Sequence, residues 1–120
     1  MQLTRIDSGP RLAQAVLAHG FVFLAGQVAE DSSRDVAGQT RQILDRIDQL
    51  LAQAGTDKSG LVSVTIYLAD IGEFGAMNVV WDRWVHPAAK PARATVEARL
   101  ATPAYRVEIQ AIDALPAGMR

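Results

Sequence analysis

The stretch DVAGQTRQILDRIDQLLAQAG, residues 35–55, carries the clearest structural signal in this chain of 120 residues. Its apolar residues recur every three or four positions, which is the period of an α-helix with one buried face. Asp35 is a suitable N-cap and Gly55 a suitable residue to end the helix, so a helix of about five turns is expected over residues 36–54. The apolar stripe consists of Val36, Ile43, Leu44, Ile47, Leu50, Leu51 and Ala54.

Strands are predicted on both sides of this helix. The first two form a plausible hairpin that turns at Gly20, and the third is a β-branched, apolar run with little expected access to solvent. The last two flank a turn at residues 101–104. The predicted strands are residues 12–19, 21–28, 61–69, 93–100 and 105–114.

A second helix is predicted to follow the third strand. Asp70 and Glu73 have the spacing of a capping box at its start, and Pro87 stops it. The order ββαβαββ predicts an α+β fold in which one partly parallel sheet carries both helices on a single face. The length, with no linker or repeat, predicts a single domain over residues 1–120.

Composition excludes several classes of protein. Hydrophobic residues make up 49% of the chain, which argues against disorder, and the net charge of −1 comes without a basic run, which argues against a nucleic-acid partner. The absence of cysteine excludes disulfides, thiolate nucleophiles and cysteine-bound metals. Two isolated histidines, His19 and His86, predict no metal site. Without a signal peptide or membrane-spanning run, a cytoplasmic location with no membrane partner is expected.

The sheet face without helices holds the residues of greatest chemical interest. By strand alternation, Arg93 and Glu108 both fall on the parity that mixes polar and apolar residues, and we assign this parity to the uncovered face. A face of this kind favours an interface between identical subunits. We therefore hypothesise a closed homo-oligomer that buries it.

Arg93 and Glu108 could simply form a surface salt bridge, which contributes about 0–1 kcal/mol. The register of a hairpin with its turn at 101–104 argues against this, because it pairs Glu97 with Glu108 and Arg93 with Ile112. Arg93 and Glu108 are then separated by more than about 10 Å along the strands. A partner from another subunit, or an anionic ligand, is the alternative for Arg93.

Several motifs follow one another along nearly the whole chain, from about residue 10 to 115: AGQVA, DVAGQTRQILDRIDQLLAQAG, MNVVWD and PARATVEARL followed by YRVEIQA. In this order they resemble the RidA family, also called YjgF/YER057c/UK114. The resemblance implies a chorismate-mutase-like fold and a homotrimer with three clefts between subunits. It also implies hydrolysis of reactive 2-imino or 2-enamino acids, such as 2-aminoacrylate, to 2-keto acids and ammonia, with no metal or organic cofactor.

The resemblance also implies site residues. The carboxylate-binding arginine of the family falls on Arg93, and the acidic residue near the imine carbon falls on Glu108. The helix asparagine falls on Asn78. Gly26 takes the place of the glycine where the backbone approaches the ligand, and Thr95 that of a residue giving a backbone contact.

Three of these cleft positions depart from the best-known branch of the family. Ala25 stands where that branch has serine, Leu12 where it has tyrosine, and Thr95 where it has cysteine. The expected cleft is therefore more apolar, which favours a bulkier substrate or slow imine hydrolysis.

In the expected reaction, Arg93 holds the carboxylate of the small acid in a two-point contact, and Glu108 positions water and shuttles a proton. Burial would raise the pKa of Glu108 and a nearby Arg93 would lower it, and the sequence leaves this balance open. The alternative function is a non-catalytic member that binds a small carboxylate as a regulator. Family members are also credited with ribonuclease or chaperone-like activity, and the net charge makes nucleic acid the weakest of these options.

Overall fold

Helix α1 spans Val36–Ala54 in the computed structural model, which describes residues 2–119. Asp35 caps the helix by accepting a hydrogen bond from the backbone N–H of Gly38. Gly55 ends it in the left-handed region, with a φ of 90°. The predicted bounds and both caps are confirmed. The apolar stripe of α1 packs in the core, where Ile43, Leu50 and the rest are buried.

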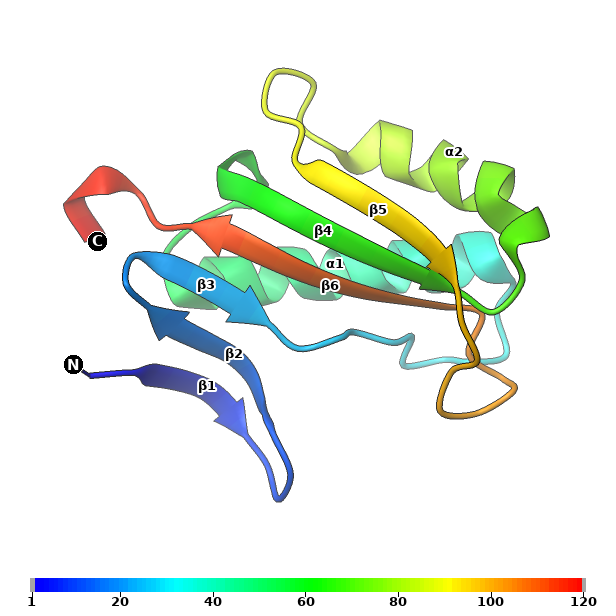
Figure 1. Cartoon of the computed structure of the whole chain (residues 1–120), viewed down its shortest axis with the longest axis horizontal. Helices are drawn as coiled ribbons and strands as arrows, with labels where there is room; N and C mark the ends of the chain where they lie inside the picture. Colours follow the sequence, from blue (N-terminus) through cyan, green and yellow to red (C-terminus); the bar gives the residue numbers. More distant parts are fainter. Residues whose placement is uncertain (1, 120) are drawn as a thin grey trace.

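The sheet has six strands in the order β1-β2-β3-β6-β4-β5, with both helices on one face (Figure 1). Neighbouring strands are antiparallel except β4 and β5, which are parallel because helix α2 connects them. A single mixed sheet with two helices confirms the predicted fold class. The strands are β1 (Thr4–Ser8), β2 (Ala13–Ala18), β3 (Phe21–Leu24), β4 (Leu61–Leu68), β5 (Ala92–Glu97) and β6 (Val107–Ala114).

Strand β1 is absent from the predicted order, which becomes βββαβαββ. Its sequence TRIDS is polar and mostly exposed, so it carries none of the apolar alternation from which a strand is predicted. The strand forms because β2 offers it an edge, on which Thr4 pairs with Leu17 and Ser8 with Ala13. Its pairing partner decides this element.

The predicted hairpin between the last two strands is wrong. Strand β4 lies between β5 and β6, so Glu97 pairs with Leu68, and Glu108 pairs with Tyr67. The predicted Glu97–Glu108 contact therefore does not form. Strand β4 takes this inner place because one of its faces is fully apolar and buried. Its other face is half-exposed in the single chain, whereas the sequence predicted little access to solvent for the whole strand.

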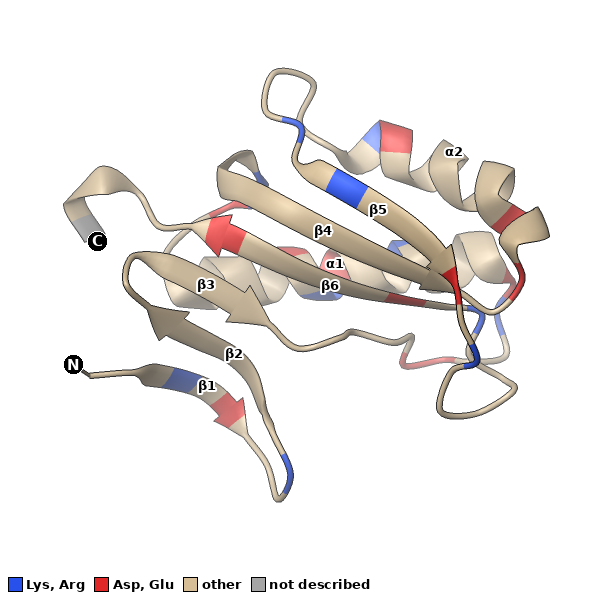
Figure 2. Ribbon diagram, viewed as in Figure 1, with Lys and Arg blue, Asp and Glu red and all other residues tan. Residues whose placement is uncertain are grey.

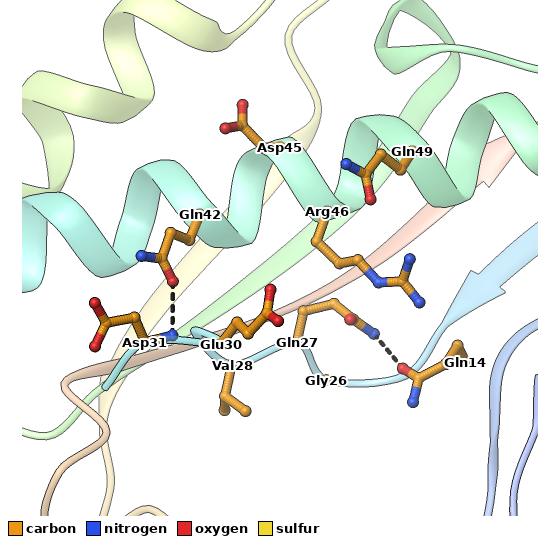
Figure 3. Close-up of a pocket in the computed structure, with 10 residues that line it drawn as sticks. All are labelled: Gln14, Gly26, Gln27, Val28, Glu30, Asp31, Gln42, Asp45, Arg46 and Gln49. Atoms are coloured by element: carbon orange, nitrogen blue, oxygen red, sulfur yellow. Dashed lines mark hydrogen bonds between the residues drawn. The ribbon is translucent and has the colours of Figure 1, made fainter. Parts of the chain in front are cut away.

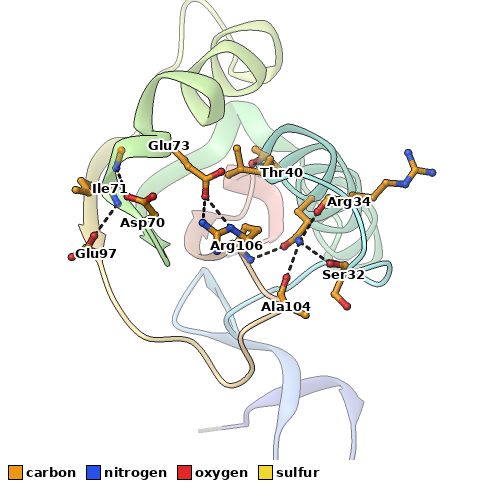
Figure 4. A network of polar contacts seen from close by, with 12 residues as sticks. Ser32, Arg34, Thr40, Asp70, Ile71, Glu73, Glu97, Ala104 and Arg106 are labelled. Carbon is orange, nitrogen blue, oxygen red and sulfur yellow. Dashed lines mark hydrogen bonds and ion pairs between the residues drawn. The ribbon is translucent and has the colours of Figure 1, made fainter.

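The second helix begins differently from the prediction. Asp70 caps a short 3₁₀ turn, Ile71–Glu73, and α2 follows over Phe74–Trp84, ending before Pro87 as expected. Glu73 does not return to the Asp70 backbone as a capping box requires. Instead its Oε1 accepts a hydrogen bond of 2.9 Å from Nε of Arg106 (Figure 4). A long-range ion pair thus takes the place of the predicted local hydrogen bond to the backbone.

Gln39 joins α1 to two loops. Its fully buried side chain donates from Nε2 to the carbonyl oxygens of Ser32, Arg34 and Ala104, at 3.2, 2.9 and 3.0 Å. Its Oε1 accepts a hydrogen bond of 2.9 Å from the backbone N–H of Arg106. Figure 4 shows these contacts with Ser32, Arg34, Ala104 and Arg106 at the N-terminal end of α1. One amide thus satisfies backbone groups of the loop before α1 and of the loop between β5 and β6.

Charged residues of both signs are spread over strands, helices and loops, without a stripe of one sign (Figure 2). None of the helices within residues 2–119 combines the length and apolar character that crossing a bilayer requires.

Asp113 is a fully buried carboxyl group at the end of β6. Its Oδ1 accepts a hydrogen bond of 2.9 Å from the Thr56 hydroxyl, while its Oδ2 has no hydrogen-bond partner within the described chain. Burial, and to a lesser extent the charge of Asp57, raise the pKa of Asp113 to about 6, against the partial opposing effect of Thr56. Between about pH 4 and pH 6, the Asp113 carboxyl group therefore stays protonated in the folded chain, whereas in the unfolded chain, with its ordinary pKa near 3.8, it has lost the proton.

This proton makes the contribution of Asp113 to stability depend on pH. The contribution is fully present below about pH 4 and is lost as the pH rises through 6. We expect the difference in free energy of unfolding, Asp113→Asn minus wild type, to rise by about 2–3 kcal/mol between pH 4 and pH 8. Urea denaturation at several pH values measures this difference, and a difference that stays flat with pH would contradict it.

Candidate functional site

Arg93 and Glu108 lie on opposite faces of the sheet, which corrects the prediction that both project from the uncovered face. Arg93 is paired with Val64 of β4, whose side chain is buried beneath the helices. Glu108 is paired with Tyr67, three positions farther along β4 and therefore of the other parity. The prediction placed Arg93 on the wrong face of β5 because it paired β5 with β6. In the structure β5 pairs with β4, and this register puts Arg93 on the face that the helices cover.

The guanidinium of Arg93 lies against two aromatic rings of α2. Its Cζ is 5.1 Å from the centroid of the Trp81 ring and 5.8 Å from that of Phe74. Within residues 2–119 it forms no ion pair and no hydrogen bond. Burial lowers the pKa of Arg93, and the negative charge of Asp82 partly opposes this effect. The result is a half-buried cation that has no ion-pair partner in the described part of the chain.

Thr95 and Asn78 accompany Arg93. Thr95 lies two residues along β5 and so points to the same face, and Asn78 lies on α2 one turn after Phe74 and one turn before Trp81. Both hold a buried oxygen that finds no hydrogen-bond partner among residues 2–119, Oγ1 of Thr95 and Oδ1 of Asn78. Such atoms are rare in native proteins because each costs about 1–3 kcal/mol. We call Arg93, Thr95, Asn78, Phe74 and Trp81 the arginine group.

Glu108 is positioned by the segment that follows β3. Gln27 exchanges two backbone hydrogen bonds with Ile109, at 2.8 and 3.0 Å, and this bridge places Gly26 beside Glu108. A Cβ on Gly26 would lie 2.9 Å from Cδ of Glu108, so glycine is what allows the carboxylate to lie there. Ala25 is held next to them by its N–H, which donates to the carbonyl oxygen of Gln14. We call Glu108, Gly26 and Ala25 the glutamate group.

Leu12 belongs to neither group in the single chain. It lies in the connection before β2, 52% exposed, with its carbonyl oxygen accepting a hydrogen bond from the N–H of Gly9. The expected sites thus fall into three places: the arginine group, the glutamate group and the exposed Leu12.

A polar cleft of about 840 Å³ opens beside Gly26, between the segment after β3 and the exposed side of α1 (Figure 3). Gln14, Gln42 and Arg46 are among the residues that line it, whereas Arg93 and Glu108 do not. The single chain therefore provides no cleft here that contains both predicted catalytic residues. Across the described part of the chain, no three histidine or acidic side chains gather where they could hold a metal ion.

Comparison with known proteins identifies the family of this chain. A protein-family model described as endoribonuclease L-PSP matches residues 3–115. The crystal structure of a YjgF family protein from Neisseria meningitidis has a TM-score of 0.94 and 43% sequence identity, covering 97% of both chains. The chain belongs to the YjgF family.

Other YjgF family relatives match over most of their length. A RutC family protein of Haemophilus ducreyi is 45% identical over 107 residues, which is 89% of this chain and 92% of the relative. The RutC family protein YoaB of Escherichia coli is 38% identical, covering 96% of this chain and all of the relative. A YjgF/YER057c/UK114 family structure from Mycobacterium tuberculosis has a TM-score of 0.86 at 29% identity, covering 95% of this chain and all of that one.

The contact between Trp81 and Arg93 was not predicted from the sequence. Trp81 is buried in the core, and one edge of α2 carries Phe74, Asn78 and Trp81 toward β5. Their spacing of four and three residues on one helix face is the signal that could have grouped them. What was missing was the identity of the strand that this helix face meets.

Proposed function

We propose that this YjgF family protein hydrolyses reactive 2-imino or 2-enamino acids, of the 2-aminoacrylate type, to 2-keto acids and ammonia. The observation that supports this most is the state of Arg93: a half-buried guanidinium with no carboxylate partner among residues 2–119. A small carboxylate supplies the missing counter-ion, and the fork of the guanidinium binds it at two points.

The catalytic cleft lies between subunits. Because the arginine and glutamate groups are on opposite faces of one sheet, only a second copy of the chain can bring a Glu108 to an Arg93. The open face of the sheet favours such an assembly, since Phe21, Phe23 and Val96 leave large apolar side chains exposed there. The resemblance to the family gives the proposed state as a homotrimer with three equivalent clefts.

Within this cleft Arg93 fixes the carboxylate and thereby the position of the C=N carbon. Glu108 takes a proton from a water molecule whose oxygen adds to that carbon, and the proton goes to the nitrogen, which leaves a hydroxyl and an amino group on one carbon. Glu108 then moves the hydroxyl proton to the amino nitrogen, the C–N bond breaks, and ammonia leaves as the carbonyl group of the 2-keto acid forms. The step consumes only water, and the close approach at Gly26 keeps the carboxylate of Glu108 beside the backbone.

A trapping assay tests the reaction. An amino-acid oxidase generates the 2-imino acid, and semicarbazide captures whatever is not hydrolysed first. We expect the wild-type chain to suppress the semicarbazone signal in proportion to its concentration. Equal adduct formation with and without the protein would contradict the proposed reaction, and a monomer in light scattering would contradict the shared cleft.

A mixing experiment tests the composite cleft directly. Arg93→Ala and Glu108→Gln chains are each expected to be inactive as pure oligomers. After they are unfolded together and refolded, about one quarter of the clefts should combine an intact Arg93 with an intact Glu108, if subunits mix at random. We expect activity to return to that fraction of wild type. If both residues of a cleft came from one subunit, mixing would restore nothing.

The glycine beside the carboxylate gives a second prediction for the same cleft. In Gly26→Ala the added methyl group would displace the flexible carboxylate of Glu108, and the backbone at residue 26 is not in the left-handed region. We expect kcat/KM for imine hydrolysis to fall by about 10-fold to 100-fold, while the free energy of unfolding changes by less than about 1 kcal/mol.

Gly75→Ala is the matched control for this change, because a Cβ at Gly75 would meet nothing within 4 Å. It should leave kcat/KM unchanged. A Gly26→Ala chain with wild-type activity would show that the position of Glu108 does not matter for the reaction.

A carboxylate-binding regulator without catalysis is the second candidate. It is favoured by Ala25 and Leu12, which place a methyl and an isobutyl group where the better-known branch has hydroxyl groups. The trapping assay separates it from the enzyme, since a regulator binds 2-keto acids without accelerating hydrolysis. RNA cleavage, which the name of the family model implies, has less support because positive charge is not gathered on one face (Figure 2).

The cytoplasmic location stays a prediction. A fission-yeast relative named mmf1, 33% identical over 115 residues, is described as mitochondrial.

A further inference from the structure

A second hollow, of about 290 Å³, opens between the two helices on the layer that covers the sheet. Its floor is apolar: Leu44 of α1 and Val80 of α2 belong to the core, and the Trp84 ring stands beside them. The volume is at the small end of the range of about 300–1,000 Å³ found for ligand pockets, so it suits a ligand built on a single ring.

The Trp84 ring is held in place from three sides. Its Nε1 donates a hydrogen bond of 3.0 Å to Oδ2 of Asp48, and its ring centroid is 5.5 Å from that of Trp81. Nζ of Lys58 lies 5.0 Å from the ring centroid. The hollow therefore has an aromatic wall with a fixed orientation, against which the apolar body of a ligand can pack.

Positive charge surrounds this wall. Arg41 from α1, Lys58 from the 3₁₀ turn Lys58–Gly60 and Arg83 from α2 all line the hollow. The acids beside them are Asp45, which also lines it, and Asp48, which accepts the hydrogen bond from the Trp84 ring. Among the described residues, none of the three cations forms an ion pair. Three cations and two anions leave a formal excess of one positive charge around a partly apolar floor.

Helix electrostatics explain only one of these cations. Arg83 lies in the last turn of α2, where the helix dipole favours positive charge. Arg41 lies in the second turn of α1, where the helix dipole does not stabilise a positive charge. The convergence of two guanidinium forks and an ammonium from separate elements is instead suited to an oxyanion, which arginine binds at two points.

We propose that this hollow binds a small organic anion. Its carboxylate or phosphate head contacts Arg41, Arg83 and Lys58, and its flat apolar body lies on Leu44, Val80 and Trp84. None of these residues belongs to the arginine or glutamate group, so the site is distinct from the proposed deaminase cleft, although the Trp84 ring contacts Trp81 of the arginine group.

Benzoate is the probe, added to the Arg93→Ala chain so that Arg93 cannot hold the carboxylate. The indole N–H resonance of Trp84, assigned with Trp84→Phe, reports binding by NMR. We expect this resonance to shift and saturate at millimolar benzoate, and the neutral analogue benzamide to bind at least about 10-fold more weakly. Phenyl phosphate identifies the preferred head group, and inorganic phosphate, which lacks the ring, should bind more weakly than either anion.

Two charge-removing variants locate the site. Arg41→Gln and Arg83→Gln replace exposed residues, and each should weaken benzoate binding by about 3-fold to 10-fold. Arg99→Gln, at an exposed arginine outside the hollow, should bind benzoate like the parent chain. The proposal is overturned if the Trp84 resonance does not move, if benzamide or inorganic phosphate binds as well as benzoate, or if both arginine variants bind unchanged.

Discussion

Replacing Arg93 with alanine is expected to lower kcat/KM for 2-imino acid hydrolysis by about 100-fold or more. The change removes a charge-assisted, two-point contact worth about 1.5–3 kcal/mol and also releases the orientation of the reacting carbon. Arg93→Lys keeps the charge and loses the fork, so it should retain an intermediate activity. The trapping assay with several concentrations of 2-imino acid measures all three proteins.

Stability separates this catalytic effect from misfolding. Arg93 forms no ion pair within the part of the chain described, so its removal forfeits only the contacts with the Phe74 and Trp81 rings, worth about 1 kcal/mol. We expect Arg93→Ala to unfold at nearly the same urea concentration as wild type. Arg99→Ala, at an exposed arginine, is the matched control and should keep full activity. If Arg93→Ala were as active as Arg99→Ala, Arg93 would not be the residue that binds the substrate carboxylate.

Gln39→Leu is expected to lower the free energy of unfolding by about 2–4 kcal/mol. Leucine fills a similar volume but offers no partner to the carbonyl oxygen of Ala104 or the backbone N–H of Arg106, both of which Gln39 now satisfies. Leaving buried backbone groups unpaired costs about 1–3 kcal/mol each. Urea denaturation monitored by circular dichroism measures the change.

Gln53→Leu on the same helix is the control for Gln39→Leu. Gln53 is exposed and its side chain makes no hydrogen bond within residues 2–119, so its replacement should change the free energy of unfolding by less than about 0.5 kcal/mol. Equal effects of the two substitutions would mean that a general increase in hydrophobicity, and not the lost hydrogen bonds, governs the result.

Local patterns predicted α1 and the turn between β2 and β3. The helix follows from its apolar period and from the caps Asp35 and Gly55, all of which act within a few residues. At the turn, His19 and Gly20 have φ values of 53° and 83°, the left-handed pair that a two-residue hairpin requires. Such signals are readable because each interaction is short-range along the chain.

The candidate site was predicted only in part. The residues Arg93, Glu108, Asn78, Gly26 and Thr95 came from the resemblance to the family, and the structure groups them in two sets. The aromatic rings beside Arg93 were not foreseen, because they depend on where α2 meets β5.

The sequence by itself determined the helices, most of the strands, the family and the residue types available for chemistry. Only the tertiary structure decided that β1 exists, that β4 separates β5 from β6, and that Arg93 and Glu108 face opposite ways. The physical reason is that strand pairing joins distant segments, and one change of neighbour or register turns every side chain of a strand to the other face.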